Sequence, residues 1–387
     1  MNDGELSNPR DQRPEVVLVG GGHAHVQVLR GLVTKPIPNV RLTLLVDQPG
    51  ALYSGMVPGV ISGQYTREEA TIDLRPLAAR AGARLVIGKA VRVDAGAGHI
   101  ELAGGNFLHY EYASLNVGSV ARGPEGQDSP AHAIATRPIS ELVSRLELAL
   151  AKLSRETRPS KVCVVGAGAA GVELACAIAA RLGATDGGHR IHEVSLIGGG
   201  GRPLPGATTR ALSRVQAALG RHHIAFCGNT RVRAVDASAL TTASGVRLPS
   251  DLTIWATGAA APPVIRDSEL PHDARGFVRT DQHLLVEGCS NLFAAGDCAT
   301  LASAPEKERA GVYAVRAGPI LLANLRRRLA GRPLESHRPQ SDYLRLLNLA
   351  DGTALGSKWG LALQGRSVAW LKDRIDRGFV SRFRFDD

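Results

Sequence analysis

Two glycine-rich stretches of this chain have the residue types and spacing that bind the pyrophosphate of a dinucleotide. The first, VVLVGGGHAHVQVL, carries Gly20 and Gly22. The second, KVCVVGAGAAGVELA, carries Gly166, Gly168 and Gly171 in complete G-x-G-x-x-G spacing. In such a motif the first glycine makes a sharp turn, the second lets the pyrophosphate approach the backbone, and the third lets helix and strand pack closely. Unpaired N–H groups at the helix start then face the phosphates.

Each stretch needs a strand before its glycines and a helix after them. A β-branched run precedes each one, at residues 16–19 and 162–165. Apolar residues at helical spacing follow, over residues 26–32 in the first copy and 174–182 in the second. Because this strand, turn and helix context separates a genuine site from a chance glycine run, we predict two dinucleotide sites.

The first copy departs from the motif at its third glycine position, which is His25. A histidine there must either widen the contact between helix and strand or turn its ring outward, toward solvent or ligand. His23 and His25 could each donate a hydrogen bond to the ligand, or could be satisfied polar groups of a first helical turn. A second strand, VRLTLLVD, ends at Asp47, 25 residues beyond Gly22. An acidic residue near this spacing accepts hydrogen bonds from an adenosine ribose.

The second copy lacks such an acid. After the strand EVSLI comes GGGGRPLPG, residues 198–206, where sites that prefer NAD usually carry Asp or Glu. Without that carboxylate a 2′-phosphate is not repelled, and Arg202 could pair with it. The sequence therefore leaves both NADH and NADPH open.

Composition sets the broad class. A length of 387 residues favours two or more domains, and 44% hydrophobic with 21% charged residues suits a soluble globular protein. We find no secretory signal and no apolar run long enough to span a membrane, so we expect a cytoplasmic protein, with peripheral contact at the inner face of the cell membrane left open. The net charge is +10, but the basic patches lack interleaved aromatic residues, so we expect no nucleic-acid partner. Five widely spaced cysteines indicate neither a disulfide scaffold nor a metal site.

Two further stretches extend the pattern, DLTIWATG at 251–258 and NLFAAGDCA at 291–299. With the two glycine motifs, the chain resembles the two-dinucleotide-binding-domain flavoproteins of the pyridine nucleotide-disulfide oxidoreductase superfamily. Within that superfamily it is similar to the type II NADH dehydrogenase-like branch, and especially to the flavoprotein domain found fused to selenide, water dikinase. The residues that carry this likeness are VGGGHAHVQVLR, YSGMVPG, LNVGS, AGVYAVRAGPILLANL and WLKDRIDRGF.

The resemblance implies an α/β fold with two Rossmann-like domains and a small C-terminal region. FAD would bind residues 14–122 plus 263–335, NAD(P)H would bind 135–262, and 336–387 would form a basic region with an amphipathic helix. The implied FAD contacts are Gly20, Gly22, His23, Ala24, His25, Asp47, Pro58, Gly118, Gly296 and Asp297. The implied nicotinamide contacts are Gly166, Gly168, Gly171, Glu173, Arg202, Thr257 and Gly258.

Two of these positions leave their roles open. Glu173 matches a position where related reductases place a carboxylate near the nicotinamide, which makes it the candidate catalytic residue. As an early-helix glutamate it could equally serve only the helix dipole. Pro58 lies in YSGMVPG, which would pass close to the flavin ring or be an ordinary loop. Relatives often carry Gln where this chain has Ala317, so a flavin or quinone contact there does not carry over.

The cysteine positions bear on the reaction. Residues 1–162 contain no cysteine, so the redox-active disulfide of classical reductases is excluded. Electrons would pass from NAD(P)H to flavin and then directly to an acceptor, with a quinone favoured. A soluble reductase of a small redox protein and a non-enzymatic flavin redox sensor are the alternatives.

The C-terminal stretch SVAWLKDRIDRGFVSRF predicts an amphipathic helix. Its apolar residues recur at spacings of 3 and 4 and are predicted to share one face, with Lys372 among the accompanying cations: Val368, Leu371, Ile375, Phe379 and Phe383. Such a helix could lie on an anionic membrane, cap the flavin domain or form a homodimer interface.

Overall fold

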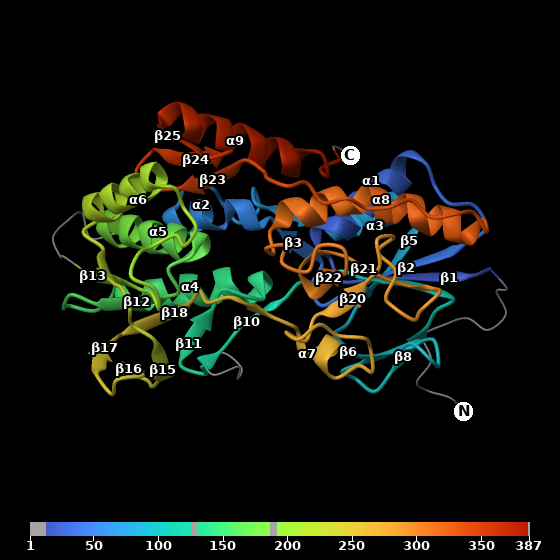
Figure 1. Ribbon diagram of the computed structural model, residues 1–387, viewed down its shortest axis with the longest axis horizontal. Helices are drawn as coiled ribbons and strands as arrows, with labels where there is room; N and C mark the ends of the chain where they lie inside the picture. Colours follow the sequence, from blue (N-terminus) through green and yellow to red (C-terminus); the bar gives the residue numbers. More distant parts are fainter. Residues whose placement is uncertain (1–12, 125–129, 186–191, 386–387) are drawn as a thin grey trace.

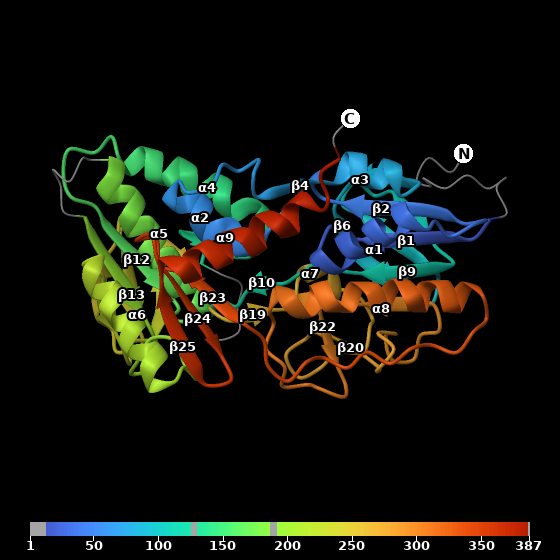
Figure 2. The same cartoon turned by 90° about the horizontal axis from the view of Figure 1, so that it is seen from above.

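The computed structural model describes residues 13–124, 130–185 and 192–385 (Figure 1). Two parallel sheets of five strands form the cores of two halves, which lie side by side in Figures 1 and 2. The first sheet has the order β21 (Leu292–Ala294), β9 (Tyr112–Leu115), β1 (Glu15–Val19), β2 (Arg41–Val46), β5 (Ala83–Ile87). The second has the order β11 (Ala133–Ala135), β18 (Leu252–Trp255), β12 (Lys161–Val165), β13 (Glu193–Ile197), β14 (Ala225–Cys227). The two orders are equivalent, strand for strand.

Burial explains why these segments are strands. β1 reads EVVLV and β12 reads KVCVV, and nearly every residue of both is buried, as expected for central strands of a parallel sheet covered on both faces. Val19 pairs with Leu45 in the first sheet, and Val165 pairs with Ile197 in the second. The registers of the two central strand pairs therefore also correspond.

Helices cover both sheets. α1 (His23–Thr34) and α5 (Ala169–Thr185) directly follow the two glycine motifs. α1 packs against α8 (Gly311–Leu329), whereas α5 packs against the short α2 (Val57–Ser62) that comes from the first half of the molecule. The remaining helices of the two halves are α3 (Leu74–Arg80), α4 (Ile139–Leu153), α6 (Thr209–Arg221) and α7 (Pro263–Arg266).

Small sheets complete each half. The first half carries β6 (Ala90–Asp94), β7 (His99–Leu102) and β8 (Phe107–His109), with the pairs β3 (Gly50–Leu52) and β4 (Thr71–Asp73), and β20 (Val278–Thr280) and β22 (Ala299–Leu301). The second half carries β15 (Val232–Val235), β16 (Ala239–Thr242) and β17 (Arg247–Pro249). The two connections between the halves pair with each other as β10 (Val120–Ala121) and β19 (Ala259–Ala260).

A C-terminal unit lies across both halves (Figures 1 and 2). Its antiparallel sheet is β23 (Arg345–Asn348), β24 (Ala354–Lys358) and β25 (Leu361–Gly365), followed by α9 (Arg366–Ser381). The sheet contacts α6 of the second half, and the end of α9 reaches the first half, where the Phe379 ring stacks on Tyr53. These observations confirm the predicted α/β class with two Rossmann-like units and a small C-terminal region.

Candidate active site

The first glycine motif forms a cradle whose glycines have steric reasons to be there. Gly20 has φ +94°, and a Cβ on it would lie 2.5 Å from the backbone oxygen of Asn116. A Cβ on Gly22 would lie 2.3 Å from the Asn116 side-chain oxygen. Both distances are far below van der Waals contact, so neither position accepts a larger residue without rearrangement.

Asn116 closes this cradle, although it was not among the predicted residues. Its Oδ1 accepts hydrogen bonds from the backbone N–H groups of Ala24 (3.0 Å) and His25 (3.3 Å), and its Nδ2 donates to the oxygen of Ala295 (2.6 Å). Asn116 is thus a side-chain cap for α1 that comes from the end of β9. The polar residue in LNVGS, directly after a buried strand, was the sequence signal for it.

His25 does not turn its ring outward, so of the predicted alternatives the outward ring is wrong and the satisfied polar group of a first helical turn is the one that occurs. The side chain is fully buried, with Nδ1 2.7 Å from the oxygen of Gly20 and Nε2 2.9 Å from the hydroxyl of Ser114. Burial lowers the pKa of His25 to about 4, so the ring is neutral at physiological pH. Its contacts are with the turn and strand β9, and they occupy both ring nitrogens.

The other predicted residues of the first half are placed as follows. Asp47 is exposed directly after β2, at the carboxyl edge of the sheet. Gly118 has φ +72° with open space around it, and Gly296 has φ +76° beside the Asn116 amide. Pro58 is buried in α2, the helix that packs on α4 and α5 of the other half. His23 is half-buried, with its ring 5.4 Å from that of Tyr53.

The second motif forms a more open cradle. Gly166 has φ +114°, and a Cβ on it would lie 2.2 Å from the oxygen of Ala256. A Cβ on Gly171 would lie 1.7 Å from the oxygen of Gly166, so this third glycine lets α5 touch the turn. A Cβ on Gly168, by contrast, would meet no atom within 4 Å. The backbone at Gly168 is therefore accessible to a bulky anion such as a pyrophosphate.

Three further predicted residues lie at the carboxyl edge of the second sheet. Thr257 donates its hydroxyl hydrogen bond to the oxygen of Arg122, in the connection between the halves. Gly258 is exposed, and a Cβ on it would lie 3.3 Å from the Arg122 guanidinium. Arg202 is exposed in the loop that follows β13. The structure therefore brings Thr257 and Gly258 together with Arg122, which the sequence did not single out.

Two arginine side chains contact Asp297. Its carboxylate forms an ion pair with Arg137, which lies between β11 and α4 of the other half, and the same guanidinium donates to Ser119. Arg309 donates from Nε to the Asp297 backbone oxygen at 3.1 Å and lies 3.3 Å from the centre of the Phe277 ring. Arg137 thus joins the two halves at a residue predicted to bind FAD.

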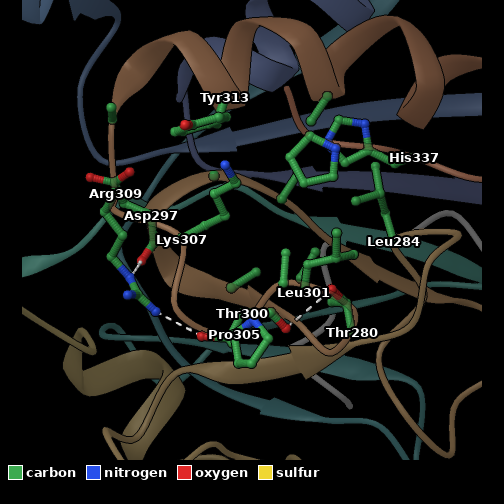
Figure 3. Close-up of a pocket in the computed structure, with 18 of the residues that line it drawn as sticks. Thr280, Leu284, Asp297, Thr300, Leu301, Pro305, Lys307, Arg309, Tyr313 and His337 are labelled. Atoms are coloured by element: carbon green, nitrogen blue, oxygen red, sulfur yellow. Dashed lines mark hydrogen bonds between the residues drawn. The ribbon is translucent and has the colours of Figure 1, made fainter. Parts of the chain in front are cut away.

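A pocket open to solvent lies beside this segment (Figure 3). The start of α8 forms one wall and residues 294–310 form another, with His337 and Ala317 also lining it. Arg309 runs along the wall and donates to the hydroxyl of Thr300 at 2.7 Å. Burial lowers the pKa of Arg309 to about 10, which leaves it charged at neutral pH.

Glu173 faces the C-terminal unit. Its Oε1 accepts a hydrogen bond from the backbone N–H of Asn348 at 2.7 Å, and burial raises its pKa to about 7, against a lowering effect of nearby Lys372. It lies beyond the first turn of α5, which contains no acidic residue, so a helix-dipole role does not account for its position. A carboxyl group with a pKa near neutrality can both take up and release a proton.

Comparison with known proteins identifies the family. A family model for pyridine nucleotide-disulphide oxidoreductases matches residues 14–318, most of the chain. The chain belongs to this family. It is also 23% identical over 358 residues to the NADH dehydrogenase-like protein YutJ of Bacillus subtilis, covering 90% of this chain and 92% of that protein.

Other members are similar over shorter or more divergent stretches. Demethylphylloquinone reductase NdbB of Synechocystis is 30% identical over 230 residues, 58% of this chain and only 54% of that relative's length. Among solved structures, the sulfide:quinone oxidoreductase of Aquifex aeolicus has a TM-score of 0.78 at 17% identity, covering 96% of this chain and 91% of that one. NDH2 of Plasmodium falciparum in complex with NADH has a TM-score of 0.74 at 15% identity, covering 95% and 97%.

The likeness to YutJ agrees with the predicted type II NADH dehydrogenase-like branch, and membership of the family confirms the predicted superfamily and the oxidoreductase class. It also confirms FAD and a pyridine nucleotide as the cofactors. The two cradles fit such groups, because Gly168 leaves its backbone open and the glycine turns have no room for side chains.

In this member of the family burial makes three of the five cysteines unreactive. All five are free thiols, and Cys163, Cys176 and Cys298 are buried. Burial raises the pKa of Cys176 to about 12 and that of Cys298 to about 11, so neither is a thiolate at neutral pH.

The C-terminal helix forms as predicted, but its apolar face is covered unevenly. Phe379 and Phe383 are buried, but Leu371 and Ile375 are 39% and 43% exposed, so only part of the apolar face is covered. Leu371 and Phe379 are eight residues apart and so lie about 80° apart around the helix, toward opposite sides of one apolar stripe. The buried face also holds Lys372, whose Nζ lies 2.6 Å from Asp376 and donates to the oxygen of Gly55 at 2.7 Å.

Proposed function

We propose that this protein is an FAD-dependent NAD(P)H dehydrogenase that passes electrons directly to a quinone. One observation carries the proposal: two dinucleotide cradles of equivalent design occur in a chain whose cysteines are all free, with no thiol before Cys163. The chain therefore has no pair of cysteines near the first cradle that could form a redox-active disulfide. Direct transfer from flavin to acceptor is the chemistry that remains.

The proposed cofactor contacts follow the two cradles. Ala24 and His25 are left out of the first set, because their backbone N–H groups donate to Asn116 and the His25 ring is buried. FAD, when bound, takes a hydride from the nicotinamide and releases electrons to the acceptor. The residues proposed to hold FAD, in segments 14–122 and 263–335, are Gly20, Gly22, His23, Asp47, Pro58, Gly118, Gly296 and Asp297. Those proposed to hold the nicotinamide nucleotide, in segment 135–262, are Gly166, Gly168, Gly171, Thr257 and Gly258.

We assign Glu173 the role of holding a proton near the acceptor. A quinone takes up two protons on full reduction, and the pKa of this carboxyl, about 7, suits their transfer. Lys372 on the buried face of α9 favours the charged form of Glu173. Asp376, the ion-pair partner of Lys372, opposes this effect, and the pKa of Glu173 therefore stays near neutrality.

The relatives support a quinone as acceptor. One is a demethylphylloquinone reductase, and short stretches of 35% to 39% identity are shared with external alternative NAD(P)H-ubiquinone oxidoreductases of potato and Arabidopsis. Quinones of this kind are lipid-soluble, so the enzyme has to work at a membrane surface. Among the helices of residues 13–124, 130–185 and 192–385, none is long and apolar enough to cross a membrane.

The C-terminal unit offers a surface for peripheral contact. It exposes six large apolar side chains within a short stretch of chain: Trp359, Leu361, Leu363, Trp370, Leu371 and Ile375. Cations accompany the two tryptophans, with Lys358 Nζ 3.9 Å from the centre of the Trp359 ring and Arg374 5.6 Å from that of Trp370. Tryptophan with lysine or arginine is the combination found at the interface of anionic membranes.

A stopped-flow measurement tests the function. Purified protein is mixed anaerobically with NADH or NADPH and then with a soluble quinone, and flavin absorbance is followed. We expect bleaching by a nucleotide and rapid recovery with the quinone. A colourless protein would contradict the FAD assignment, and bleaching without recovery would point to a redox-protein acceptor or a sensor.

Co-sedimentation with anionic lipid vesicles tests the surface. Changing Trp359 and Trp370 together to Ser should abolish binding while leaving turnover with the soluble quinone intact. Unchanged binding would show that another surface makes the contact. A concentration-dependent mass that the double substitution reduces to that of a monomer would instead assign the surface to a homodimer.

A further inference from the structure

The loops that follow β2 and β13 occupy equivalent places in the two halves. Gly20 N–H donates to the oxygen of Leu45 at 2.8 Å, and Gly166 N–H donates to the oxygen of Ile197 at the same distance. Since Leu45 and Ile197 correspond, the residues two positions later also correspond. Asp47 of the first loop is thus the counterpart of Gly199 in the second.

The side chain of Arg231 lies beside Gly199. A Cβ built on Gly199 would lie 3.5 Å from Cγ and 3.9 Å from Nε of Arg231. The space next to this strand end, which in the first half belongs to the Asp47 carboxylate, is taken in the second half by a guanidinium stem. The charge at this position is therefore reversed between the two halves.

Backbone hydrogen bonds fix the turn before Arg231 on the loop. Asn229 N–H donates to the oxygen of Gly200 at 3.0 Å, and Thr230 N–H donates to the oxygen of Gly198 at 2.8 Å. These two bonds, to the residues on either side of Gly199, hold Arg231 next to the strand end. Arg231 nevertheless lies more than 30 residues from Gly199 in sequence. That distance hides it from any motif read along the chain.

The charge of Arg231 is not compensated by any carboxylate in the described part of the chain. No carboxylate of the described segments lies within ion-pair distance of Arg231 or of Arg202, and both side chains are exposed. A carboxylate at this strand end accepts hydrogen bonds from ribose hydroxyls, whereas arginine accommodates a phosphate on the 2′-oxygen. The planar guanidinium can bind that phosphate through two parallel hydrogen bonds.

We propose that Arg231, assisted by Arg202, makes the second cradle selective for NADPH over NADH. The proposal rests on the function proposed above, because it assumes that a nicotinamide nucleotide occupies this cradle. A charge-assisted contact to the 2′-phosphate should favour NADPH by about 10- to 100-fold in affinity. The preference should weaken as ionic strength rises, because both arginines are exposed to solvent.

Isothermal titration of the flavin-loaded protein with NADP+ and with NAD+ tests this directly. Arg231→Gln should lower affinity for NADP+ at least about tenfold and leave NAD+ binding unchanged. Gly199→Asp should go further and reverse the preference, because it restores the carboxylate of the first half. The space at Gly199 accepts a side chain, since the contacts there are ordinary van der Waals distances and its φ is not positive.

Two matched controls isolate the position of the charge. Gly200→Asp adds the same charge one residue away, where a Cβ meets no atom within 4 Å. Arg158→Gln removes one positive charge at the opposite edge of the same sheet, before β12, where Arg158 pairs with Asp251. Both should keep the NADP+ preference of the unmodified protein.

The outcomes are separable. Equal or tighter binding of NAD+ by the unmodified protein would overturn the selectivity, while the dehydrogenase function would stand. An NADP+ preference that survives Arg231→Gln would overturn the assignment of this residue. Failure of both nucleotides to bind, and to bleach the flavin, would overturn the proposed function as well.

Discussion

In both glycine cradles a helix packs against the turn before it, but the residues at the third position of the motif are very different. In the second half Gly171 lets α5 lie directly on the oxygen of Gly166. In the first half His25 stands at the equivalent place and satisfies the oxygen of Gly20 with its ring. A contact made by removing a side chain in one half is made in the other by a buried hydrogen bond. A glycine and a buried histidine at this position thus both allow the helix to contact the turn.

The ends of the neighbouring strands differ in the same sense. Asn116 follows β9 and caps α1 through its side chain, whereas Ala256, its counterpart after β18, has no polar atom with which to cap α5. The first cradle is therefore closed by side chains, and the second stays open around Gly168. A closed cradle suits a cofactor that remains bound, and an open one suits a nucleotide that leaves after each turnover.

The largest effect should come from adding one methyl group to the second cradle. Gly171→Ala places a Cβ 1.7 Å from the oxygen of Gly166, so α5 has to shift. We expect a loss of more than about 3 kcal/mol in the free energy of unfolding, measured with urea, together with loss of nucleotide binding. Gly183→Ala is the control on the same helix, since its Cβ meets no atom within 4 Å. Equal behaviour of the two variants would show that the close approach is not needed.

Removing the His25 ring should destabilise the first cradle. His25→Ala leaves the oxygen of Gly20 and the hydroxyl of Ser114 without this buried partner and opens a cavity. We expect a cost of about 2 to 4 kcal/mol in unfolding free energy and weaker FAD retention. His132→Ala, at an exposed position, should cost little. A His25 variant as stable as this control would contradict a structural role for the ring.

The same histidine gives a pH signature. Its folded pKa of about 4 lies below the ordinary value of 6.5, so the unfolded chain binds the proton more readily. The stability that His25 contributes is present above pH 6.5 and is lost as pH falls toward 4. Unfolding free energy of the unmodified protein minus that of His25→Ala should therefore shrink over this range.

Glu173 provides a test with the opposite sign. Counting from the third position of each motif, Glu173 corresponds to Gln27 of the first half, so Glu173→Gln gives α5 the residue that α1 has. The pKa of Glu173 is raised from 4.5 to about 7, so its contribution is complete below pH 4.5 and is lost as pH rises through 7. The unmodified protein should lose up to about 3 kcal/mol relative to the variant between these values. A pH-independent difference would contradict this account.

A smaller effect should follow from removing the cap. Asn116→Ala frees the N–H groups of Ala24 and His25, and we expect about 1 to 3 kcal/mol of destabilisation and faster release of FAD. Asn106→Ala, in the turn between β7 and β8, is the matched control for loss of an asparagine side chain. If FAD release is unchanged in Asn116→Ala, the cap does not shape the cofactor site.

The sequence predicted the features that depend on neighbouring residues. Strand, turn and helix at both motifs, and the exposed Asp47 at a strand end, follow from patterns within about 30 residues. The ring of His25 and the cap from Asn116 depend on β9, which joins the sheet about 90 residues later. Alignment of the two halves at their glycines would have placed Asn116 opposite Ala256 and marked it as the difference.

The uneven burial of the C-terminal helix could not be predicted, for a related reason. A repeat of apolar residues indicates that a helix has a buried face, but not which neighbour covers each part of it. α9 leaves the C-terminal sheet at one end and packs on Tyr53 at the other, so its apolar residues meet different surroundings along its length. Lys372 is buried because Asp376 and the oxygen of Gly55 are there to receive it.

The sheet order has a consequence for biosynthesis. The outer strand β21, residues 292–294, pairs with β9, and Lys372 reaches back to Gly55. A ribosome that adds about 5 to 20 residues per second needs roughly 10 to 35 s to go from residue 115 to residue 292. Through that interval the nascent first half exposes the open edge of β9, while residues 133–255 can already assemble all five strands of the second sheet. The half that begins first is finished last, and it is the half for which a chaperone would matter most.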